Sequence, residues 1–317
     1  MSNSGNKNTV FKKKEKGGDV VHKIQRFFLE NKLNKLSRQH LKHRRQLAVF
    51  SFDYVSTAIN IDGIYEVDEL EIFFEWLKQL NSDEIFKGSA VDVGANIGNH
   101  SLYFSDYFNE VLSYEPQPLT FKLLSVNSQL ATNIRCFNFG LSSSEKKTPF
   151  VVDQKNMGGS HIAAEGDSCG VNLWLKTLDS VRIEADPPVK LMKIDVEGHE
   201  YDVLLGAKEV IKKDQPIIIF EQHKSDFIGN STKSVDLIKS YNYSNFACIE
   251  KSPSPPSAFP VSLQLLYSTV FRLIKGSSRA VVMVDEFQPK FYPFIIAIPD
   301  RLISNIHGLK INNTKIK

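Results

Sequence analysis

Short apolar segments alternate with segments of helical periodicity between residues 89 and 250, and this alternation constrains the fold more than any other feature of the chain. The apolar segments are continuous runs such as "QPIIIFEQ", which is typical of strands covered on both faces. The intervening segments, such as "EYDVLLGAKEVIKK", have the length and spacing of amphipathic helices. The alternation predicts an α/β fold in which a mostly parallel sheet carries helices on both faces.

The chain divides into four parts by composition and punctuation. We expect a basic extension over residues 1–46, an entry segment over 47–89, a main domain over 90–300 and a C-terminal tail over 301–317. In the entry segment, "LAVFSFDYV" predicts a strand and "DELEIFFEWLKQLN" predicts a helix. The final strands of the main domain are expected at "RAVVMVDEF" and "YPFIIAIP".

Two stretches interrupt the alternation within the main domain. Residues 142–180 are rich in Gly and Ser, and we expect a functional loop or an added hairpin near the site there. A Pro-rich break opens an insert near 252–280, in which "VSLQLLYSTVFRLIKG" predicts an apolar helix.

The basic extension differs sharply in charge from the rest of the chain. Residues 1–46 contain 13 Lys and Arg against 3 acidic residues, whereas the remainder contains 26 against 33. We expect residues 1–20 to be disordered and residues 21–46 to form a helix, with Ile24, Phe27 and Leu33 among its apolar residues. Packing of this helix on its own domain is the favoured role, and contact with an anionic membrane or nucleic acid stays open.

The cysteines and the hydropathy pattern predict a cytoplasmic protein. Cys136, Cys169 and Cys248 are scattered and odd in number, which is typical of reduced cysteines in a reducing compartment. The basic start has no apolar segment of a secretory signal behind it, and no apolar run is long enough to span a membrane. No Cys or His cluster has metal-ligand spacing, so the sequence assigns no metal site.

The stretch "AVDVGANIGNH" joins a predicted strand to a predicted helix through a turn with two glycines. Asp92 stands at the carboxyl end of the strand, where open α/β sheets bind ligands. Gly94 and Gly98 allow a tight turn and a close approach of a ligand to the backbone. Glu115 ends the next strand, 21 residues after Gly94, where a carboxylate can accept hydrogen bonds from both ribose hydroxyls of a nucleoside cofactor.

The spacing of the turn distinguishes between nucleoside cofactors. A dinucleotide site requires G-x-G-x-x-G, whereas this chain has D-V-G-A-N-I-G, with a carboxylate that would repel a pyrophosphate. S-adenosylmethionine carries a ribose, an ammonium and a carboxylate, and it suits the turn better than NAD. The expected cofactor-binding residues are Asp92, Gly94, Ala95, Asn96, Gly98, Asn99 and Glu115.

A second polar motif, "KIDVEGHE", follows another apolar strand and places Asp195, Glu197 and His199 at the same sheet edge. A carboxylate such as Asp195 is costly to bury unpaired at the end of a central strand, which favours a function for it. Glu200 falls in the first turn of a helix, where an acid stabilises the helix dipole. By the same reasoning Glu221 and His223, in "IIIFEQH", lie at the end of the next strand.

Taken in order, "VDVGANIGNHSLYF", "SYEPQP", "FNFGLSS", "LKTLDSV", "LMKIDVEGHEYDVLLGA" and "QPIIIFEQ" resemble the FkbM family of S-adenosylmethionine-dependent methyltransferases. The resemblance covers about residues 48–225 and extends to the strand near 292–299. "GIYEVDELEIFFEWL" also resembles the family's entry segment. The resemblance implies a class I methyltransferase fold, Rossmann-like, with a seven-stranded sheet and methyl transfer to an oxygen nucleophile. It further implies a sugar, glycan or related metabolite as acceptor.

A hydroxyl is a weak nucleophile near neutral pH, so a general base would raise the rate. Asp195 and His199 are the candidates, with Glu197 beside them as a third catalytic residue. His161, in "GGSHI", is an alternative base or a substrate contact, and Glu221 is expected to bind substrate.

Two other functions stay open at this point. The basic extension would suit a nucleic-acid methyltransferase, but the Asn-Pro-Pro-Tyr type of motif is absent after the strand that ends in "KIDVEG". Basic tails often bind anionic surfaces without specificity, so no specific nucleic-acid partner is expected. A non-catalytic cofactor-fold protein is the other alternative, and the complete cofactor signature argues against it.

Overall fold

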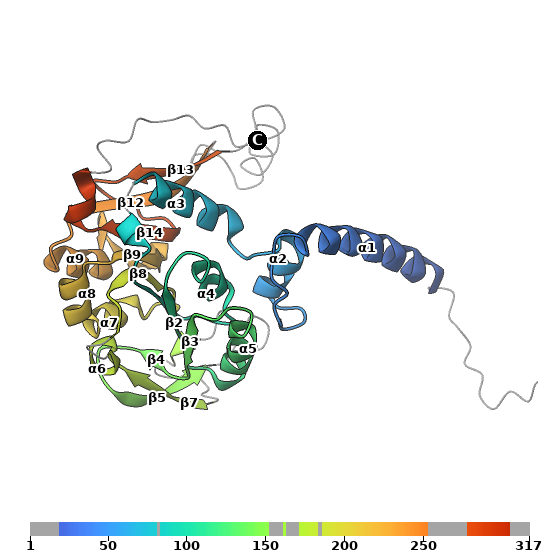
Figure 1. The fold of residues 1–317 in the computed structure, drawn as a ribbon, viewed down its shortest axis with the longest axis horizontal. Coiled ribbons are helices and arrows are strands. Elements are labelled where there is room, and N and C mark those ends of the chain that lie inside the picture. The colour runs from blue at the N-terminus through green and yellow to red at the C-terminus, as the bar shows by residue number, and fades with distance from the viewer. Residues whose placement is uncertain are drawn as a thin grey trace, which may run out of the picture.

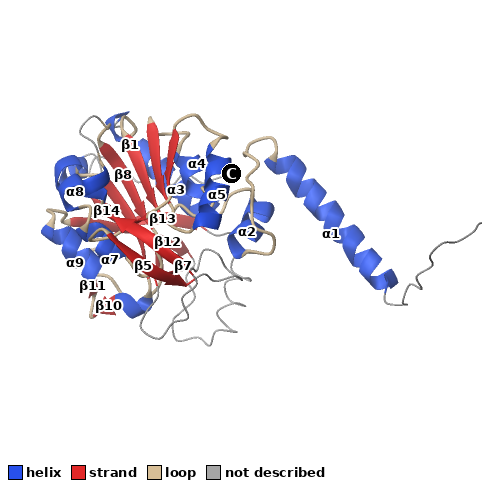
Figure 2. Ribbon diagram, turned by 90° about the horizontal axis from the view of Figure 1, so that it is seen from below, coloured by secondary structure: helices blue, strands red, loops and turns tan. Residues whose placement is uncertain are grey.

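A single large sheet organises the structure, a computed structural model that describes residues 19–80, 83–151, 161–162, 171–182, 186–252 and 278–304. The strand order is β13-β12-β14-β9-β8-β1-β2-β3, and the run from β9 to β3 is parallel. Figure 2 shows this sheet, with β1, β8, β14, β12 and β13 labelled. β14 is antiparallel to β9 and β12, and β13 adds an antiparallel edge strand beside β12. The mostly parallel sheet is confirmed, with eight strands where seven were expected. The strands are β1 (Ser89–Val93), β2 (Glu110–Tyr114), β3 (Ile134–Phe137), β8 (Val189–Ile194), β9 (Ile217–Gln222), β12 (Asn245–Ser252), β13 (Ser278–Met283) and β14 (Tyr292–Ile298).

Helices cover both faces of this sheet (Figure 1). Ala90 of β1 packs into a cluster with α3 and α4, whereas its neighbour Val91 packs into a cluster with α7, α8 and α9. Successive strand residues therefore meet apolar partners on opposite faces, which explains the continuous apolar runs. The helices are α3 (Val67–Gln79), α4 (Asn99–Phe104), α5 (Pro118–Ser128), α7 (Glu200–Leu205), α8 (Lys208–Asp214) and α9 (Lys233–Ser240).

The helix predicted over "EYDVLLGAKEVIKK" is divided at Gly206 into α7 and α8. A Cβ at this glycine would lie 1.9 Å from the carbonyl oxygen of Ser142, so the helix backbone approaches the neighbouring loop too closely for a side chain.

The entry segment corrects one expectation. Residues 47–55 form no strand; instead Asp53 caps α2 (Tyr54–Asp62) by accepting a hydrogen bond from the Ser56 N–H at 3.3 Å. Val55 and Ile59, one helical turn apart, are buried together with Ile97 of the glycine turn. The capping aspartate and this spacing outweigh the strand preference of the valines and aromatic residues in the stretch.

The excursion over residues 142–180 supplies three strands of a second, four-stranded sheet, whose order with the preceding strand β4 is β4-β7-β5-β6. β5 and β7 pair antiparallel, so the expected hairpin is confirmed. The segment predicted as one strand, "IRCFNFGLS", is divided between β3 in the large sheet and β4 in the small one. The elements between residues 140 and 181 are β4 (Gly140–Leu141), β5 (Lys146–Val151), β6 (His161–Ile162), β7 (Val171–Lys176) and α6 (Leu178–Val181).

The basic extension forms a long helix, α1 (Asp19–His40), that projects from the body of the protein (Figures 1 and 2). Its apolar side chains are exposed, among them Phe27 at 61% and Phe28 at 66%. The expectation that this helix packs on its own domain is therefore wrong, because only its C-terminal end reaches α2. None of the helices that the structure describes is long and apolar enough to cross a bilayer.

Short elements complete the described chain: η1 (Asp83–Ile85), η3 (Lys224–Asp226), β10 (Phe227–Ile228), β11 (Ser231–Thr232) and η4 (Asp300–Leu302). Cys136 is half-buried and Cys248 is buried, and both are free thiols, as expected. The predicted disorder of residues 1–20 is wrong for Asp19 and Val20, which begin α1, and residues 1–18 lie outside the described residues. Cys169, the insert helix after Pro260 and the tail from residue 305 lie outside them as well.

Candidate functional site

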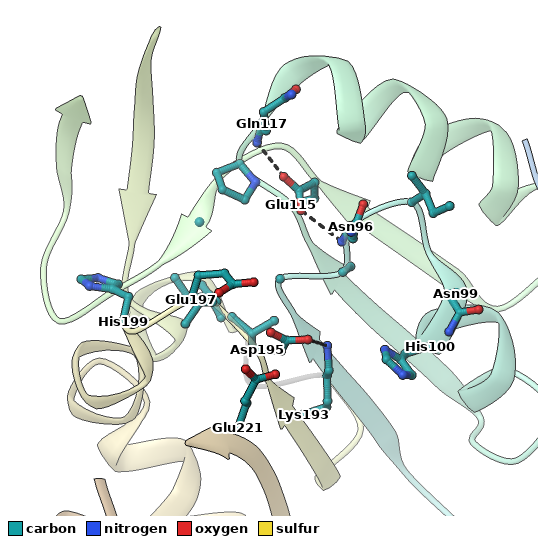
Figure 3. Close-up of a pocket in the computed structure, with 18 of the residues that line it drawn as sticks. Asn96, Asn99, His100, Glu115, Gln117, Lys193, Asp195, Glu197, His199 and Glu221 are labelled. Carbon is teal, nitrogen blue, oxygen red and sulfur yellow. Dashed lines mark hydrogen bonds and ion pairs between the residues drawn. The ribbon is translucent and has the colours of Figure 1, made fainter. Parts of the chain in front are cut away.

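A pocket lies at the carboxyl ends of β1, β2, β8 and β9, and both predicted motifs contribute to its wall (Figure 3). Parallel strands end at the same sheet edge, so residues distant in sequence meet there. The entry segment and the small sheet close the pocket with Tyr54, Tyr65, Phe150 and Ile162. Of the predicted cofactor-binding residues, Gly94, Ala95, Asn96, Asn99 and Glu115 line it.

Gly94 brings the glycine turn against the end of β8. Its φ is 76°, and a Cβ there would lie 1.8 Å from the carbonyl oxygen of Asp195. The N–H groups of Gly94 and Ala95 both donate to the carbonyl oxygen of Tyr114 at 3.0 Å. The turn is therefore fixed between β2 and β8, and only glycine fits at its first position.

Glu115 is buried at the end of β2 with its carboxylate held in place by the backbone. One oxygen accepts a hydrogen bond from the Asn96 N–H at 3.0 Å and the other from the Gln117 N–H at 2.8 Å (Figure 3). Burial raises the pKa of Glu115 to about 7, against the opposing effect of these two hydrogen bonds. A carboxylate has about four acceptor positions, so two remain for ribose hydroxyls.

Asp92 and Gly98 do not line the pocket, which corrects the expectation that they contact the cofactor. Asp92 is fully buried and accepts a hydrogen bond from the Ser101 hydroxyl at 2.6 Å, so it fastens β1 to α4. Gly98 precedes α4 with φ 91°, and a Cβ there would lie 2.8 Å from a methyl group of Leu124. Both residues therefore hold the glycine turn in its conformation without lining the pocket.

Lys193, which is buried, and Asp195, which is half-buried, form an ion pair at the end of β8. The Lys193 Nζ lies 3.0 Å from Asp195 Oδ2 and 3.8 Å from Asp92 Oδ1. Burial alone would lower the pKa of Lys193, but the two carboxylates raise it above its ordinary value. Burial disfavours the charged form of Asp195 as well, yet Lys193 holds the Asp195 pKa below its ordinary value. The ionised Asp195 carboxylate therefore faces the pocket.

The "DVEGHE" turn holds Glu197 and His199 at the pocket wall. Glu200 is buried and accepts hydrogen bonds from the N–H groups of Gly198 at 3.1 Å and Val196 at 3.3 Å. His199 Nε2 lies 2.9 Å from the Ser142 hydroxyl, and its Nδ1 lies 3.6 Å from Asp202 Oδ2. Burial lowers the pKa of His199. Both nitrogens of this ring are thus directed toward neighbours in the chain.

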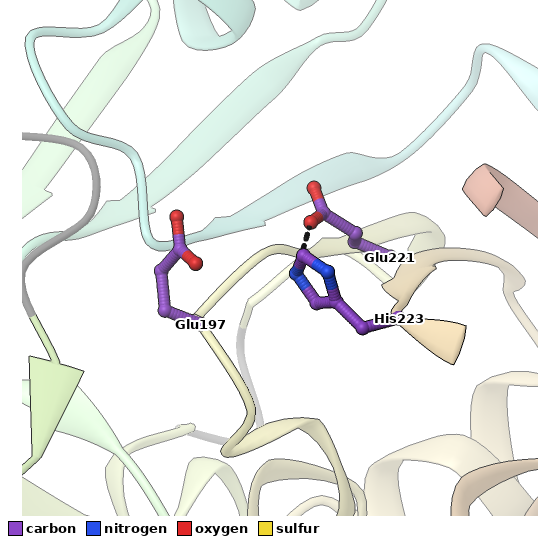
Figure 4. A group of neighbouring side chains, drawn as sticks. All are labelled: Glu197, Glu221 and His223. Carbon is purple, nitrogen blue, oxygen red and sulfur yellow. Dashed lines mark ion pairs between the residues drawn. The ribbon is translucent and has the colours of Figure 1, made fainter. Parts of the chain in front are cut away.

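Glu221 and His223 meet Glu197 at the side of the pocket formed by β9 (Figure 4). Glu221 Oε1 lies 2.8 Å from His223 Nε2. Burial, followed by the nearby carboxylates of Asp195, Glu197 and Glu66, raises the pKa of Glu221 to about 9. Sequence reasoning placed these residues at one sheet edge, but it did not bring Glu197 and His223 into one group.

Several residues of the site were not predicted from the sequence. His100 is buried in the pocket wall, and its Nε2 lies 3.1 Å from Glu66 Oε2. The Asn99 amide exchanges hydrogen bonds of 3.0 and 3.1 Å with the backbone of Tyr65, which fixes the entry segment over the pocket. Asn99 was predicted as a cofactor contact, and the polar residue beside it was the available signal for His100. His161 lies on β6, next to the pocket-lining Ile162.

The arrangement defines a class of protein, an α/β enzyme with a nucleoside-cofactor pocket at the carboxyl edge of its sheet. Residues 92–244 match the model of the methyltransferase FkbM domain. Hexuronic acid methyltransferase AglP of Haloferax volcanii is 32% identical over 172 residues, which are 51% of this chain and 68% of AglP. The chain belongs to the FkbM family of methyltransferases, so it is an S-adenosylmethionine-dependent methyltransferase.

Two further comparisons cover part of the length of each protein. Methyltransferase sdnD of Sordaria araneosa is 32% identical over 155 residues, which are 38% of this chain and 60% of sdnD. The crystal structure of the methyltransferase FkbM from Methylobacillus flagellatus aligns with a TM-score of 0.35 and 18% identity, covering 71% of this chain and 53% of that one.

Proposed function

We propose that this enzyme transfers a methyl group from S-adenosylmethionine to a hydroxyl of a sugar or glycan. The observation that carries the proposal is the shared pocket, in which the glycine turn and Glu115 face the carboxylates that follow β8 and β9. When bound, S-adenosylmethionine supplies an electrophilic methyl group on a sulfonium. A hydroxyl oxygen held in line with that methyl group displaces the sulfur, so the task of the protein is largely positioning.

The cofactor fits the residues of the glycine-turn side. Glu115 has acceptor positions left for the two ribose hydroxyls, and the backbone of Gly94, Ala95 and Asn96 lines the same wall without bulky side chains. The proposed cofactor contacts are therefore Gly94, Ala95, Asn96 and Glu115, with Asn99 acting through the backbone of Tyr65.

The acceptor hydroxyl would lie against Asp195. Because Lys193 keeps this carboxylate ionised, it can accept the hydroxyl hydrogen bond and take the proton as the oxygen attacks. Glu197 lines the pocket beside Asp195, and we propose that it contacts the acceptor as well. His199 becomes a positioning residue, because its two ring nitrogens face Ser142 and Asp202.

The lining of the acceptor side supports a polyhydroxylated acceptor. Tyr54, Tyr65 and Phe150 offer aromatic surface, and the carboxylates of Asp195, Glu197 and Glu221 offer hydrogen-bond acceptors. The relative AglP is named a hexuronic acid methyltransferase, which agrees with a sugar-type acceptor.

The test is transfer of radiolabelled methyl groups from S-adenosylmethionine to a panel of acceptors by the full chain. The panel contains uronate-bearing and neutral oligosaccharides, tRNA and duplex DNA. Label on a saccharide hydroxyl supports the proposal, and label on nucleic acid alone would replace it with the nucleic-acid alternative. Binding of S-adenosylhomocysteine without transfer to any saccharide would contradict it.

We also propose that α1 contacts an anionic lipid surface. Val21, Ile24, Phe27, Phe28 and Leu29 expose apolar side chains on a helix that carries a surplus of Lys and Arg. Aromatic and aliphatic side chains insert at the bilayer interface while basic side chains attract anionic headgroups, a combination that nucleic acid does not require.

A further inference from the structure

Three donor side chains from the ends of two neighbouring strands converge beside the acceptor wall. Glu197 belongs to the turn after β8, Glu221 is the last residue but one of β9, and His223 follows that strand. One donor atom from each residue lies within 4.8 Å of the other two (Figure 4). Around an octahedral ion with metal–oxygen bonds of about 2.1 Å, neighbouring donors lie about 3 Å apart and opposite donors about 4.2 Å apart. The 2.8 Å between Glu221 Oε1 and His223 Nε2 is close to the first of these spacings.

The charges around these residues form a second, independent observation. Among the described residues that line the pocket, four are carboxylates, Glu115, Asp195, Glu197 and Glu221, whereas Lys193 is the single Lys or Arg. Lys193 is already engaged by Asp195 and Asp92. The pocket therefore holds more acidic groups than its one lysine can pair with, and a cation would balance those that are ionised.

We infer that Glu197, Glu221 and His223 bind a divalent metal ion that holds the acceptor hydroxyl, an inference that rests on the proposed methyl transfer. Two carboxylates and one imidazole suit Mg²⁺ or Mn²⁺, whereas ions that prefer thiolates have no sulfur ligand here. Three protein ligands leave positions open for acceptor oxygens. The ion would act as a Lewis acid that favours ionisation of the hydroxyl, and Asp195 would receive its proton.

The same ion gives the pocket a preference among acceptors. A uronate carboxylate would meet repulsion from Asp195 and Glu197 without a cation, whereas a bound ion can bridge the acceptor and the protein. The metal site thus predicts that an acidic sugar needs the ion for binding more than a neutral sugar does.

Binding of Mn²⁺ to the full chain tests the site without any acceptor. It is measured by calorimetry and by electron paramagnetic resonance. We expect one Mn²⁺ per chain in the wild type and a loss of affinity of about tenfold or more in Glu221→Gln and in His223→Ala. Glu197→Gln, at an exposed position, removes one proposed carboxylate ligand and should also lower the affinity for Mn²⁺. Glu209→Gln, an exposed carboxylate beside Lys208, is the matched control and should bind Mn²⁺ as the wild type does.

S-adenosylhomocysteine binding is measured in every variant to confirm that its pocket is folded. Absence of Mn²⁺ binding in the wild type, or equal binding in the wild type and all three site variants, would overturn the site. Methyl transfer to a saccharide at full rate in excess EDTA would overturn its role while leaving the proposed function intact. Mn²⁺ binding that the variants abolish, without methylation of any saccharide, would support the site and reject the proposed function.

Discussion

Gly94 and Asp195 meet backbone to backbone beneath the pocket, close enough that a Cβ on Gly94 would lie 1.8 Å from the Asp195 carbonyl oxygen. The Asp195 N–H also donates to the carbonyl oxygen of Val93 at 3.1 Å. The glycine turn and the end of β8 are therefore held together through the backbone, and their close approach requires that residue 94 has no side chain.

Gly94→Ala should lower the free energy of unfolding by about 2–4 kcal/mol, because the new methyl group meets fixed backbone and φ is positive. It should also weaken S-adenosylhomocysteine binding, since the turn must shift. Urea unfolding and calorimetry measure the two effects. Gly229→Ala is the matched control: its φ is also positive, but a Cβ there would have no atom within 4 Å, so we expect a cost of about 1–2 kcal/mol and unchanged binding. Equal behaviour of the two variants would contradict the close approach.

Glu115→Ala should weaken S-adenosylhomocysteine binding by about 1.5–3 kcal/mol, the usual contribution of hydrogen bonds to a charged group. The variant also leaves the N–H groups of Asn96 and Gln117 without their acceptor. Glu115→Gln retains one acceptor oxygen and should show a smaller loss. Calorimetric titration gives both values, and unchanged affinity in Glu115→Ala would mean that the ribose lies elsewhere.

Cofactor binding should strengthen as pH rises through about 7, which is the pKa to which burial raises Glu115. Ribose hydroxyls favour the carboxylate form, so binding releases a proton and affinity increases with pH. Asp92 and Lys193 are the charged groups that act on Glu115, and their opposite effects partly cancel.

The raised pKa of Glu115 has the opposite effect on stability: the cofactor-free protein becomes less stable, not more, as pH rises. Because the folded pKa of Glu115 is above its unfolded value, this residue's contribution to stability falls as pH rises from about 4.5 to about 7. Glu115→Gln should flatten both pH profiles. If wild type and variant have parallel profiles, Glu115 is not the titrating group.

α1 should bring the protein to vesicles that contain phosphatidylserine, with binding that weakens as salt increases. Replacement of Phe27 and Phe28 by Ser should reduce co-sedimentation, because the apolar insertion is lost. Neutral vesicles serve as the control for charge. Equal co-sedimentation of the wild type and the double variant would leave the exposed aromatic residues without a role in membrane contact.

Asp195→Asn should preserve folding and most cofactor affinity but lower methyl transfer by about 10²-fold or more, because an amide cannot take the hydroxyl proton. His199→Ala should cost less, since we assign His199 to positioning. A collapse of the melting curve in Asp195→Asn would instead favour a structural role for the Lys193–Asp195 pair.

The local chemistry of the chain accounts for which parts of this fold could be predicted. The apolar runs and the two polar strand ends are encoded in neighbouring residues, so the parallel sheet and part of the pocket lining followed from sequence. The structure of residues 47–55 could not be predicted in this way, because the stretch is compatible with a strand and with the start of a helix. The cap formed by Asp53 favours the helix. The exposure of Phe27 and Phe28 also depends on where the helix lies relative to the domain.

The site itself could be predicted only in part for the same reason. Asp92 and Glu115 both follow the pattern of strand-end carboxylates, yet one is covered by α4 and the other faces the pocket. The meeting of Glu197 with His223 requires the pairing of β8 with β9 and the path of two turns, which no local pattern records.

Mass spectrometry of the saccharide pool in cells that carry the wild-type chain or the Asp195→Asn variant tests the central claim most directly. We expect a saccharide that gains one methyl ether on a hydroxyl in cells with the wild type and lacks it in cells with the variant. Identical saccharide pools in the two strains, with both proteins folded and both binding S-adenosylhomocysteine, would contradict the proposed methyl transfer.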